Sequence, residues 1–199
     1  MKLTIIGASG HGKVVADIAE KNGYNEIEFF DDDVSIEHCG KWPVVGTVHE
    51  ALNRDNDVFI AIGKAETREK LMERFDGRHF PVLIHPNAVV ADDVVIGEGS
   101  VVIAGAVINP GAKIGRGVIV NTCSSVDHDC IIGNFVHISV GAHLSGTVKV
   151  GKGSWIAVGA SVSNNVEISE GVMVGAGAVV IRDITEAGTY VGVPARILR

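Results

Sequence analysis

Residues 124–139 read SSVDHDCIIGNFVHIS, and an aliphatic residue stands at every sixth position of this stretch, at Val126, Ile132 and Ile138. The same spacing continues without a break from residue 90 to residue 180. A repeat of fixed period indicates an architecture in which each unit buries its apolar side against its neighbours. The remaining anchor positions are Val90, Ile96, Val102, Ile108, Ile114, Val120, Leu144, Val150, Ile156, Val162, Ile168, Val174 and Val180.

The six-residue period predicts a parallel β-helix of the hexapeptide kind, whose known members wind left-handed. Three hexapeptides make one triangular coil, the anchors fill the prism, and the glycine or asparagine that often follows an anchor permits the corner turn. Residues 18 apart then lie one above the other, separated by one strand spacing of roughly 4.8 Å. The alternative, a β-sandwich of short strands, does not keep a strict six-residue phase.

Residues 1–84 follow a different pattern, in which strands and helices alternate. Alternation of this kind predicts a parallel sheet with helices on its faces, that is, a small α/β unit with a Rossmann-like fold. We therefore expect two domains, residues 1–84 and residues 85–199. The expected strands are 2–6, 27–33, 57–63 and 80–85, and the expected helices are 11–22 and 65–75.

Composition excludes several classes of function. The net charge is −7, with 17 Lys and Arg against 24 Asp and Glu, which argues against a nucleic-acid partner. The three cysteines form no CxxC pair, as expected of a reduced compartment. The opening MKLTIIGASG is too short in its apolar part for a signal peptide or a membrane span. We expect a cytoplasmic protein without membrane insertion.

Apolar residues also occur between the anchors, for example Val107, Ile131 and Val179. Such residues face outward or lie at corners, so they leave apolar surface on the walls of the prism. This pattern predicts self-association, most naturally as a homotrimer around a threefold axis.

Three motifs carry a resemblance that spans nearly the whole chain. The unbroken hexapeptides followed by VGVPAR (191–196) resemble the acyl-CoA-dependent acyltransferases. GASGHGKVVADIAEKNGY (7–24) and VNTCSSVDHDCIIGNFVHISVGAHLSG (120–146) resemble one branch of these enzymes, the NeuD/PglD-type sugar acetyltransferases. That branch contains sialic-acid O-acetyltransferases and N-acetyltransferases acting on UDP-linked 4-amino sugars. The resemblance implies acetyl-CoA as co-substrate and no metal.

His128 is the candidate general base. It lies two positions after the anchor Val126, so it projects from the coil rather than into the prism. Acyl transfer from a thioester needs a base to take a proton from the attacking nucleophile, and histidine suits this role near neutral pH. From the sequence, either Asp127 or Asp129 could orient the ring. The resemblance implies Asp129, where relatives often have the longer Glu.

Gly146 follows His128 by one full coil of 18 residues. A glycine beside the base lets ligand and backbone approach closely, and its N–H could hold the tetrahedral oxyanion. The resemblance implies the same role.

Contacts to acetyl-CoA are implied by the resemblance at His137, Val158 and Ala176. Val158 and Ala176 are 18 apart and so fall in one column, along which a pantetheine arm could lie. The arginines near the end of the chain, Arg182, Arg196 and Arg199, could meet the phosphates of CoA.

The loop GASGHG follows a strand and opens a helix, which is the usual setting of an anion site. Acidic residues end the second strand, where a carboxylate commonly meets a ribose hydroxyl. The resemblance implies that this region binds the sugar nucleotide. The corresponding residues are Ser9, Gly10, His11, Asp31, Asp32 and Gly63.

The sequence therefore predicts an acetyl-CoA-dependent N-acetyltransferase acting on a UDP-linked 4-amino sugar in bacterial glycan biosynthesis, by direct transfer with His128 as base. O-acetylation of sialic acid by the same machinery is the nearest alternative. A metal lyase of the γ-carbonic-anhydrase type would instead use His128, His137 and His143 as zinc ligands across a trimer interface. A non-catalytic assembly protein would keep the β-helix only for trimerisation.

Overall fold

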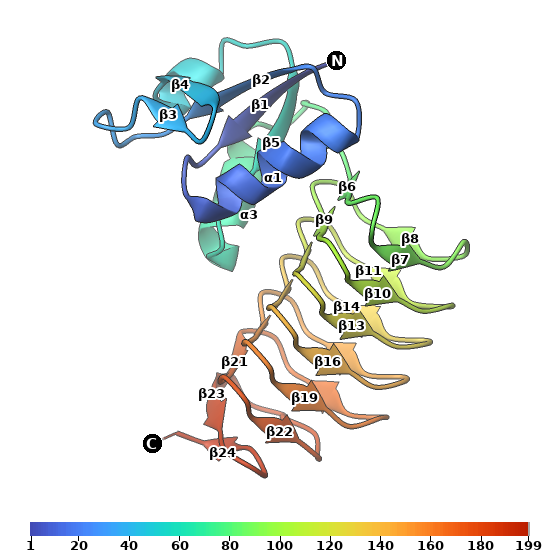
Figure 1. Cartoon of the computed structure of the whole chain (residues 1–199). Helices are drawn as coiled ribbons and strands as arrows, with labels where there is room; N and C mark the ends of the chain where they lie inside the picture. The colour runs from blue at the N-terminus through green and yellow to red at the C-terminus, as the bar shows by residue number, and fades with distance from the viewer. Residues whose placement is uncertain (199) are drawn as a thin grey trace. The chain divides into compact units, whose positions relative to one another are not determined.

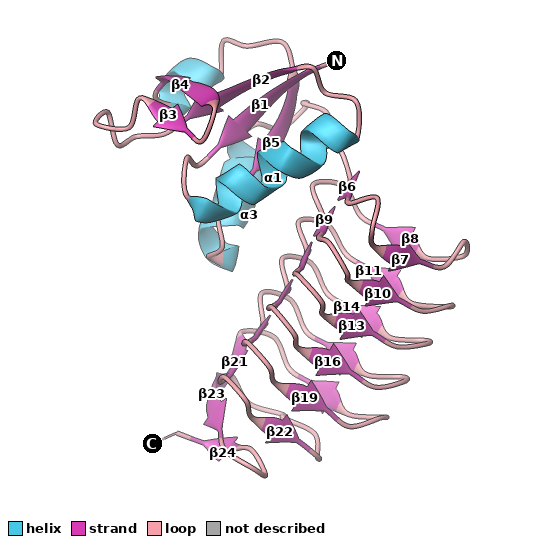
Figure 2. Ribbon diagram, viewed as in Figure 1, coloured by secondary structure: helices cyan, strands magenta, loops and turns pink. Residues whose placement is uncertain are grey.

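The computed structural model describes residues 1–198 and divides into two compact units, Met1–His85 and a second that begins at Pro86. Figure 1 follows the chain through both units and Figure 2 marks the secondary structure. The first unit is α/β, and the second contains strands and turns but no helix among its described residues. No helix within residues 1–198 is long and apolar enough to cross a membrane.

A five-stranded sheet in the order β3-β4-β2-β1-β5 forms the centre of the first unit. All neighbouring strands are parallel except β3 and β4, which form an antiparallel pair. The sequence pattern did not show the pair β3–β4 or the short helix α2. The strands are β1 (Lys2–Ile6), β2 (Glu26–Phe30), β3 (His38–Cys39), β4 (Trp42–Gly46) and β5 (Asp57–Ile60). The strand expected over 80–85 is reduced to β6 (Leu83–Ile84), and it is not part of this sheet.

Three helices flank this sheet: α1 (Gly10–Lys21), α2 (Val48–Ala51) and α3 (Ala65–Arg74). The core is formed by buried apolar side chains of β1, β2 and α1, whereas Val14 of α1 is exposed and Ile27 of β2 is half-buried. The buried residues are Leu3, Ile5, Ile6, Val15, Ala16, Ile18, Ala19, Phe29 and Phe30. Gly12, in the first turn of α1, has no room for a side chain, because a Cβ there would collide with the carbonyl oxygen of Gly7 and press on the ring of Phe29. The glycine spacing of the first loop therefore lets α1 start directly above the end of β1.

The second unit is the expected parallel β-helix, with three walls of stacked two-residue strands (Figure 1). Each coil pairs with the next in a register of 18 residues, as in Val107↔Ser125 and Ser125↔His143. The first wall contains β7 (Val89–Val90), β10 (Val107–Ile108), β13 (Ser125–Val126), β16 (His143–Leu144), β19 (Ser161–Val162) and β22 (Val179–Val180). The second wall contains β8 (Val95–Ile96), β11 (Lys113–Ile114), β14 (Ile131–Ile132), β17 (Lys149–Val150) and β20 (Glu167–Ile168). The third wall contains β9 (Val101–Val102), β12 (Ile119–Val120), β15 (His137–Ile138), β18 (Trp155–Ile156), β21 (Val172–Val174), β23 (Gly188–Val191) and β24 (Arg196–Ile197).

The predicted anchors are the last residues of strands β7 to β22, and from Val102 onward they are buried to within a few per cent of exposure. Two residues before each anchor, a small or β-branched side chain completes the core, as at Ala142 and Ala160. Where this residue is serine, the hydroxyl is satisfied internally: Ser100 Oγ donates to the carbonyl of Gly115, and Ser154 Oγ donates to that of Ser169. The period alone thus identified the interior of the prism.

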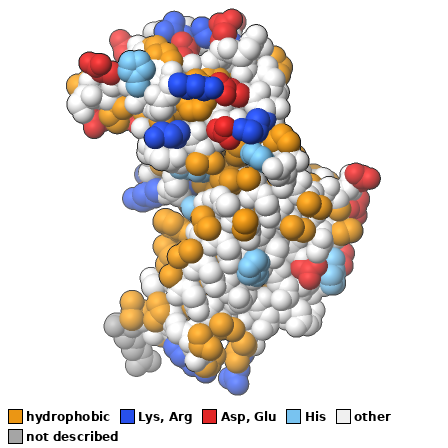
Figure 3. Space-filling view, in the orientation of Figure 1, with side chains coloured by type: hydrophobic (Ala, Val, Ile, Leu, Met, Phe, Trp, Pro, Cys, Tyr) orange, Lys and Arg blue, Asp and Glu red, His pale blue; other side chains and the backbone are white. Residues whose placement is uncertain are grey.

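The outward-facing strand residues differ between the first two walls. On the first wall they are Val89, Val107, Ser125, His143, Ser161 and Val179, none of which is Lys, Arg, Asp or Glu. Figure 3 shows much of the β-helix surface in this view without charged side chains. On the second wall they include Lys113, Lys149 and Glu167. The first wall is therefore the better suited of the two to contact another copy of the chain.

Candidate active site

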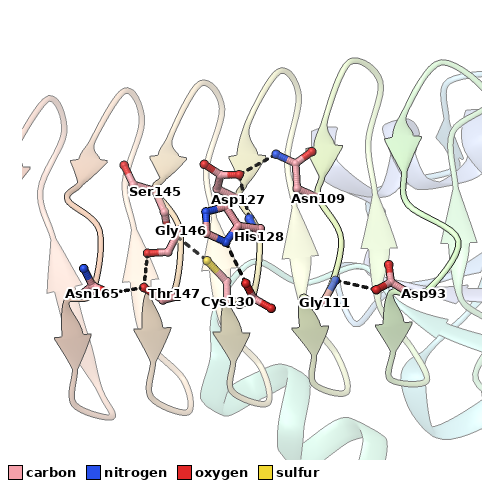
Figure 4. A network of polar contacts seen from close by, with 11 residues as sticks. Asp93, Asn109, Gly111, Asp127, His128, Cys130, Ser145, Gly146, Thr147 and Asn165 are labelled. Carbon is pink, nitrogen blue, oxygen red and sulfur yellow. Dashed lines mark hydrogen bonds and ion pairs between the residues drawn. The ribbon is translucent and has the colours of Figure 1, made fainter.

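The turn between the first and second walls carries His128, and we call the column formed by residues 110, 128, 146, 164 and 182 the His128 corner. His128 lies between β13 and β14, and its side chain is exposed. Figure 4 shows this corner from Asp93 to Asn165, with polar side chains on successive coils and Gly146 beside the His128 ring. Because the anchor Val126 fixes the strand, the turn after it directs the imidazole outward.

The two acids that flank His128 have different partners. Asp129 Oδ2 lies 2.8 Å from Nδ1 of the His128 ring. Asp127 Oδ1 instead accepts hydrogen bonds from the backbone N–H of His128, at 2.8 Å, and from Asn109 Nδ2, at 2.7 Å. In this structure the ring-orienting carboxylate is therefore Asp129, and its short side chain does reach the ring.

Asp129 reaches the ring from a backbone conformation that non-glycine residues rarely adopt, with a φ of 58°. Its N–H donates to the carbonyl of Pro110 at 3.0 Å, which ties the turn to the preceding coil. Aspartate tolerates this left-handed region better than most residues. The turn thus places the carboxylate beside Nδ1 without a longer side chain.

The electrostatics of the pair favour a more basic imidazole. The hydrogen bond that Asp129 accepts from the His128 ring raises the pKa of His128, and the nearby charges of Asp127 and Asp129 add to the increase. Because Nδ1 faces the carboxylate, the neutral ring carries its proton on Nδ1 and leaves the lone pair on Nε2. Nε2 is therefore the atom available to accept a proton.

Gly146 lies one coil beyond His128 and is buried. A Cβ on Gly146 would collide with Nε2 of the His128 ring, so the absent side chain makes room for the imidazole. The carbonyl of Gly146 accepts from Asn165 N–H and from Thr147 Oγ1, whereas its own N–H has no acceptor among the described residues. An N–H donor without a partner is thus positioned next to the candidate base.

The residues expected to contact acetyl-CoA lie elsewhere on the prism. His137 is on the third wall in β15, whereas Val158 and Ala176 lie in the turn from the third wall to the first. We call this column, residues 122, 140, 158 and 176, the Val158 corner. Val158 and Ala176 are exposed. The first wall therefore separates this corner from the His128 corner of the same chain.

Two further residues accompany His137 that the sequence reasoning did not select. Asn121 Nδ2 lies 3.1 Å from Nε2 of His137. Trp155, one coil beyond His137, stacks on its ring with centroids 4.9 Å apart and an interplanar angle of 19°. Trp155 also donates from Nε1 to Ser139 Oγ at 2.5 Å. The 18-residue rule could have found Trp155, since it places residue 155 directly over residue 137.

In the first unit, the structure brings the glycine-rich loop next to the end of β2. Ser9 is the N-cap of α1, and its side chain makes no capping hydrogen bond. Gly10 and Gly63 both face open space, since no atom lies within 4 Å of a Cβ built on either. Both oxygens of Asp31 accept from the backbone within the unit, from Ala8 N–H at 2.7 Å and Asp33 N–H at 2.9 Å.

Asp32 and Gly63 also have structural partners, whereas His11 does not use Nε2. Asp32 Oδ1 accepts from Val48 N–H at the start of α2. Gly63 is held through its carbonyl, which accepts from Arg68 Nη1 at 2.9 Å. Burial, with a smaller contribution from the charge of Arg68, lowers the pKa of His11 to about 4, so this ring is neutral at neutral pH. Nε2 of His11 is shielded from solvent and has no hydrogen-bond partner among the described residues.

The histidines of the zinc alternative do not form a cluster within one chain. His128 lies at a corner, His137 on the third wall and His143 on the first wall. Among residues 1–198 there is no group of three or more His, Cys, Asp or Glu side chains placed to hold a metal ion. Cys130 is fully buried and its Sγ lies 3.2 Å from the carbonyl of Ser145. Burial raises the pKa of the Cys130 thiol, which disfavours it as a nucleophile.

Arg182 is exposed at the His128 corner, three coils beyond His128, and Arg196 is exposed in β24. Arg199 lies outside the described residues.

The chain resembles known proteins in sequence and in structure. The sequence model of the PglD N-terminal domain family matches residues 2–75. The UDP-N-acetylbacillosamine N-acetyltransferase of Bacillus subtilis is 38% identical over 110 residues, and the match spans about half of each protein, 51% of either chain.

Two solved structures match along nearly their full length. The acetyltransferase domain of PglB from Neisseria gonorrhoeae has a TM-score of 0.95 and 43% identity, covering 99% of both chains. PerB from Caulobacter crescentus, solved in complex with CoA and GDP-perosamine, has a TM-score of 0.94 and 37% identity, covering 100% of this chain and 98% of that one.

Proposed function

The chain belongs to the family of sugar N-acetyltransferases that includes PerB and the acetyltransferase domain of PglB. We propose that it transfers the acetyl group of acetyl-CoA to the 4-amino group of a nucleotide-linked sugar. The observation that carries the proposal is the arrangement at the His128 corner. There an exposed imidazole is oriented by Asp129, and a glycine N–H without an acceptor lies beside it.

The proposed reaction is direct. The amine nitrogen attacks the carbonyl carbon of the thioester, and Nε2 of His128 takes a proton from that nitrogen. The carbonyl oxygen gains negative charge in the tetrahedral intermediate, which the Gly146 N–H stabilises by a hydrogen bond. When the carbon–sulfur bond breaks, the proton passes to the departing sulfur. The products are the N-acetyl sugar and CoA as the thiol.

Asp129 acts through the ring. A carboxylate on Nδ1 holds the tautomer whose Nε2 is basic and stabilises the imidazolium that forms during transfer. Asp127, which is bonded to the backbone of the turn, supports the loop and not the ring. We assign Asp129 as the orienting residue on this difference.

We further propose that the site is shared between subunits of a homotrimer. If three uncharged first walls face a threefold axis, the His128 corner of one subunit meets the Val158 corner of the next. The acetyl-CoA arm would then lie between these corners and touch Val158 and Ala176 of the neighbouring subunit. Within one chain the first wall keeps the two corners apart, which supports an intersubunit site.

The nucleotide end of the acceptor is assigned to the first unit. Ser9 and Gly10 at the start of α1 offer backbone N–H groups suited to a diphosphate, and the open space at Gly63 leaves room for the ligand. His11 adds a neutral ring with an unused Nε2, while Asp31 and Asp32 shape the end of β2. The B. subtilis relative is named for a UDP-sugar, and we take UDP as the nucleotide. We place the protein in the cytoplasm, in keeping with its three unpaired cysteines.

The test is release of CoA thiol from acetyl-CoA with a panel of acceptors: a UDP-linked 4-amino sugar, a GDP-linked 4-amino sugar, sialic acid, and serine as a blank. His128→Ala is assayed in parallel, and His79→Ala serves as the matched control because His79 is an exposed histidine of the first unit, paired with Asp57 and outside the proposed site. We expect turnover with an amino sugar that is lost in His128→Ala and kept in His79→Ala. Turnover with sialic acid alone would replace the N-acetyl proposal by O-acetylation.

A further inference from the structure

Thr147 follows Gly146 in the turn between the first and second walls and has an unusual backbone conformation. Its φ is 61°, in the left-handed region that side chains branched at Cβ rarely adopt. Among residues 1–198, five non-glycine residues have φ between 53° and 61°, and Thr147 is the only one of them with a β-branched side chain. Strained backbone of this kind persists only where surrounding contacts enforce it, and it clusters at functional sites.

The hydrogen bonds of Thr147 enforce this conformation. Oγ1 donates to the carbonyl oxygen of Gly146 at 2.6 Å and lies 2.5 Å from Oδ1 of Asn165, one coil further along (Figure 4). The N–H of Thr147 donates to the carbonyl oxygen of His128 at 2.9 Å. Thr147 is therefore bonded both to the residue that carries the candidate base and to the residue that carries the candidate oxyanion donor.

The bond to Gly146 matters because a glycine backbone has more conformations open to it than that of any other residue. The missing side chain of Gly146 makes room for the His128 ring, but it also removes a restraint on the direction of the N–H. A catalytic donor must point in one direction, since misplacement by about 1 Å can reduce the rate about 10²-fold.

Two donors hold the Gly146 carbonyl and so restrict this freedom. The N–H of Asn165 donates to it at 3.1 Å, and the hydroxyl of Thr147 supplies the second and shorter bond. The strained conformation of Thr147 thus serves to place its hydroxyl on the backbone of Gly146.

We propose that Thr147 is a positioning residue for acyl transfer, which holds the Gly146 N–H at a fixed place relative to Nε2 of His128. The inference rests on the proposed function, since it takes this N–H as the donor to the oxyanion. The hydroxyl acts through the backbone of Gly146 and not on the substrate. A serine at position 147 can supply the same bond, whereas a valine cannot.

The test compares Thr147→Val and Thr147→Ser with the wild-type protein. Valine has the shape of threonine without the hydroxyl, so we expect kcat to fall about tenfold and KM for both substrates to stay unchanged, as for a contact made only in the transition state. Thr147→Ser should retain most of the wild-type kcat. The acidic limb of the pH profile should stay in place in both variants, because Asp129 is the main cause of the raised pKa of His128.

Ser100→Ala is the matched control. Ser100 Oγ also joins two coils, because it donates to the carbonyl of Gly115 and accepts from the N–H of Val118, but it lies in the turn from the second wall to the third. Its removal should lower the melting temperature and leave kcat unchanged.

If Thr147→Val does not fold, Thr147→Gly replaces it, because glycine removes the same hydroxyl and relieves the left-handed backbone. The same loss of kcat is expected. Unchanged kcat in the variant without the hydroxyl, or an equal loss in Thr147→Ser, would overturn the inference.

Crystal structures of the wild-type protein and of the variant without the hydroxyl separate this inference from the proposed function, because they require no acceptor. We expect the backbone of Gly146 to rotate and its N–H to move by about 1 Å relative to Nε2 of His128. This displacement would support the positioning role even if no sugar were acetylated. A backbone over residues 145–147 that superposes on the wild type would refute that role and leave the transferase proposal in place.

Discussion

Two corners border the first wall, and both repeat with the same 18-residue period. They differ in the side chains that they carry. The His128 corner carries side chains that differ from coil to coil, namely Pro110, His128, Gly146, Asn164 and Arg182. From residue 140 on, the Val158 corner carries only Val140, Val158 and Ala176, each followed by a glycine with φ between 61° and 66°. The repeat fixes where a corner residue points but not what it does. One corner can therefore hold the reacting groups while the other stays small enough for an extended arm to pass.

The largest expected effect comes from removing the base at the first of these corners. His128→Ala should lower kcat/KM by about 10²–10⁴-fold, the usual contribution of a positioned general base. The melting temperature should change little, because the side chain is exposed. Steady-state kinetics and a thermal melt check both, and a loss of less than tenfold would move the chemistry away from this corner.

Adding one methyl group beside the base is the next test. Gly146→Ala should reduce kcat by about 10²-fold, because the new Cβ occupies the position of Nε2 and displaces the ring. Asn164→Ala, one coil further along the same column, is the control, since that position already accommodates a side chain. Unchanged kcat in Gly146→Ala would show that the ring has another productive position.

The Val158 corner should respond through binding rather than chemistry. Ala176→Trp should raise KM for acetyl-CoA about tenfold, because a bulky side chain narrows the path of the arm. After equal amounts of this variant and of His128→Ala subunits are mixed, about one quarter of the sites should have the wild-type KM if each site joins two subunits of a trimer. No recovery after confirmed subunit exchange would place both corners in one chain's site.

The smallest expected effect is a shift in the pH dependence of activity when Asp129 is replaced. Deprotonated His128 is the reactive form, so activity falls as pH drops through its pKa, which Asp129 raises. Asp129→Asn should therefore shift the acidic limb to lower pH and also lower the plateau, because the ring becomes a weaker base. Asp127→Asn should leave the acidic limb closer to that of the wild type, since the hydrogen bond that Asp129 accepts from His128 is the main cause of the raised pKa of His128. If only Asp127→Asn moved the limb, the assignment of Asp129 would be wrong.

Much of the fold followed from local pattern. The six-residue period predicted the β-helix and its buried anchors from Val102 to Val180, because a repeat reports the same environment many times. The strands β1, β2 and β5 and the helices α1 and α3 also matched the pattern. The pair β3–β4 and the short helix α2 were not predicted from the sequence, because such short elements have too few residues to produce a recognisable periodicity.

Some residues of the candidate site could also be predicted from the sequence, and others could not. His128, Asp129 and Gly146 could be selected from the motif and the 18-residue rule, and their roles stay predictions until the variants are tested. The stack of Trp155 on His137 and the contact with Asn121 were not predicted, because the 18-residue spacing was applied to His128 and Val158 and not to His137. The sequence identified Asp31 and Asp32 as candidate ligand contacts. It did not show that both carboxylates already accept hydrogen bonds from backbone N–H groups of the first unit.

The sequence by itself determined the repeating prism, the position of each anchor and the identity of the residue at every corner, because these depend on a fixed period along the chain. Only the tertiary structure decided between Asp127 and Asp129, since both flank His128 and differ only in where the turn directs them. It also decided that Gly146 must lack a side chain, because a Cβ there would collide with Nε2 of His128. These outcomes depend on distances between coils, which chain order does not contain.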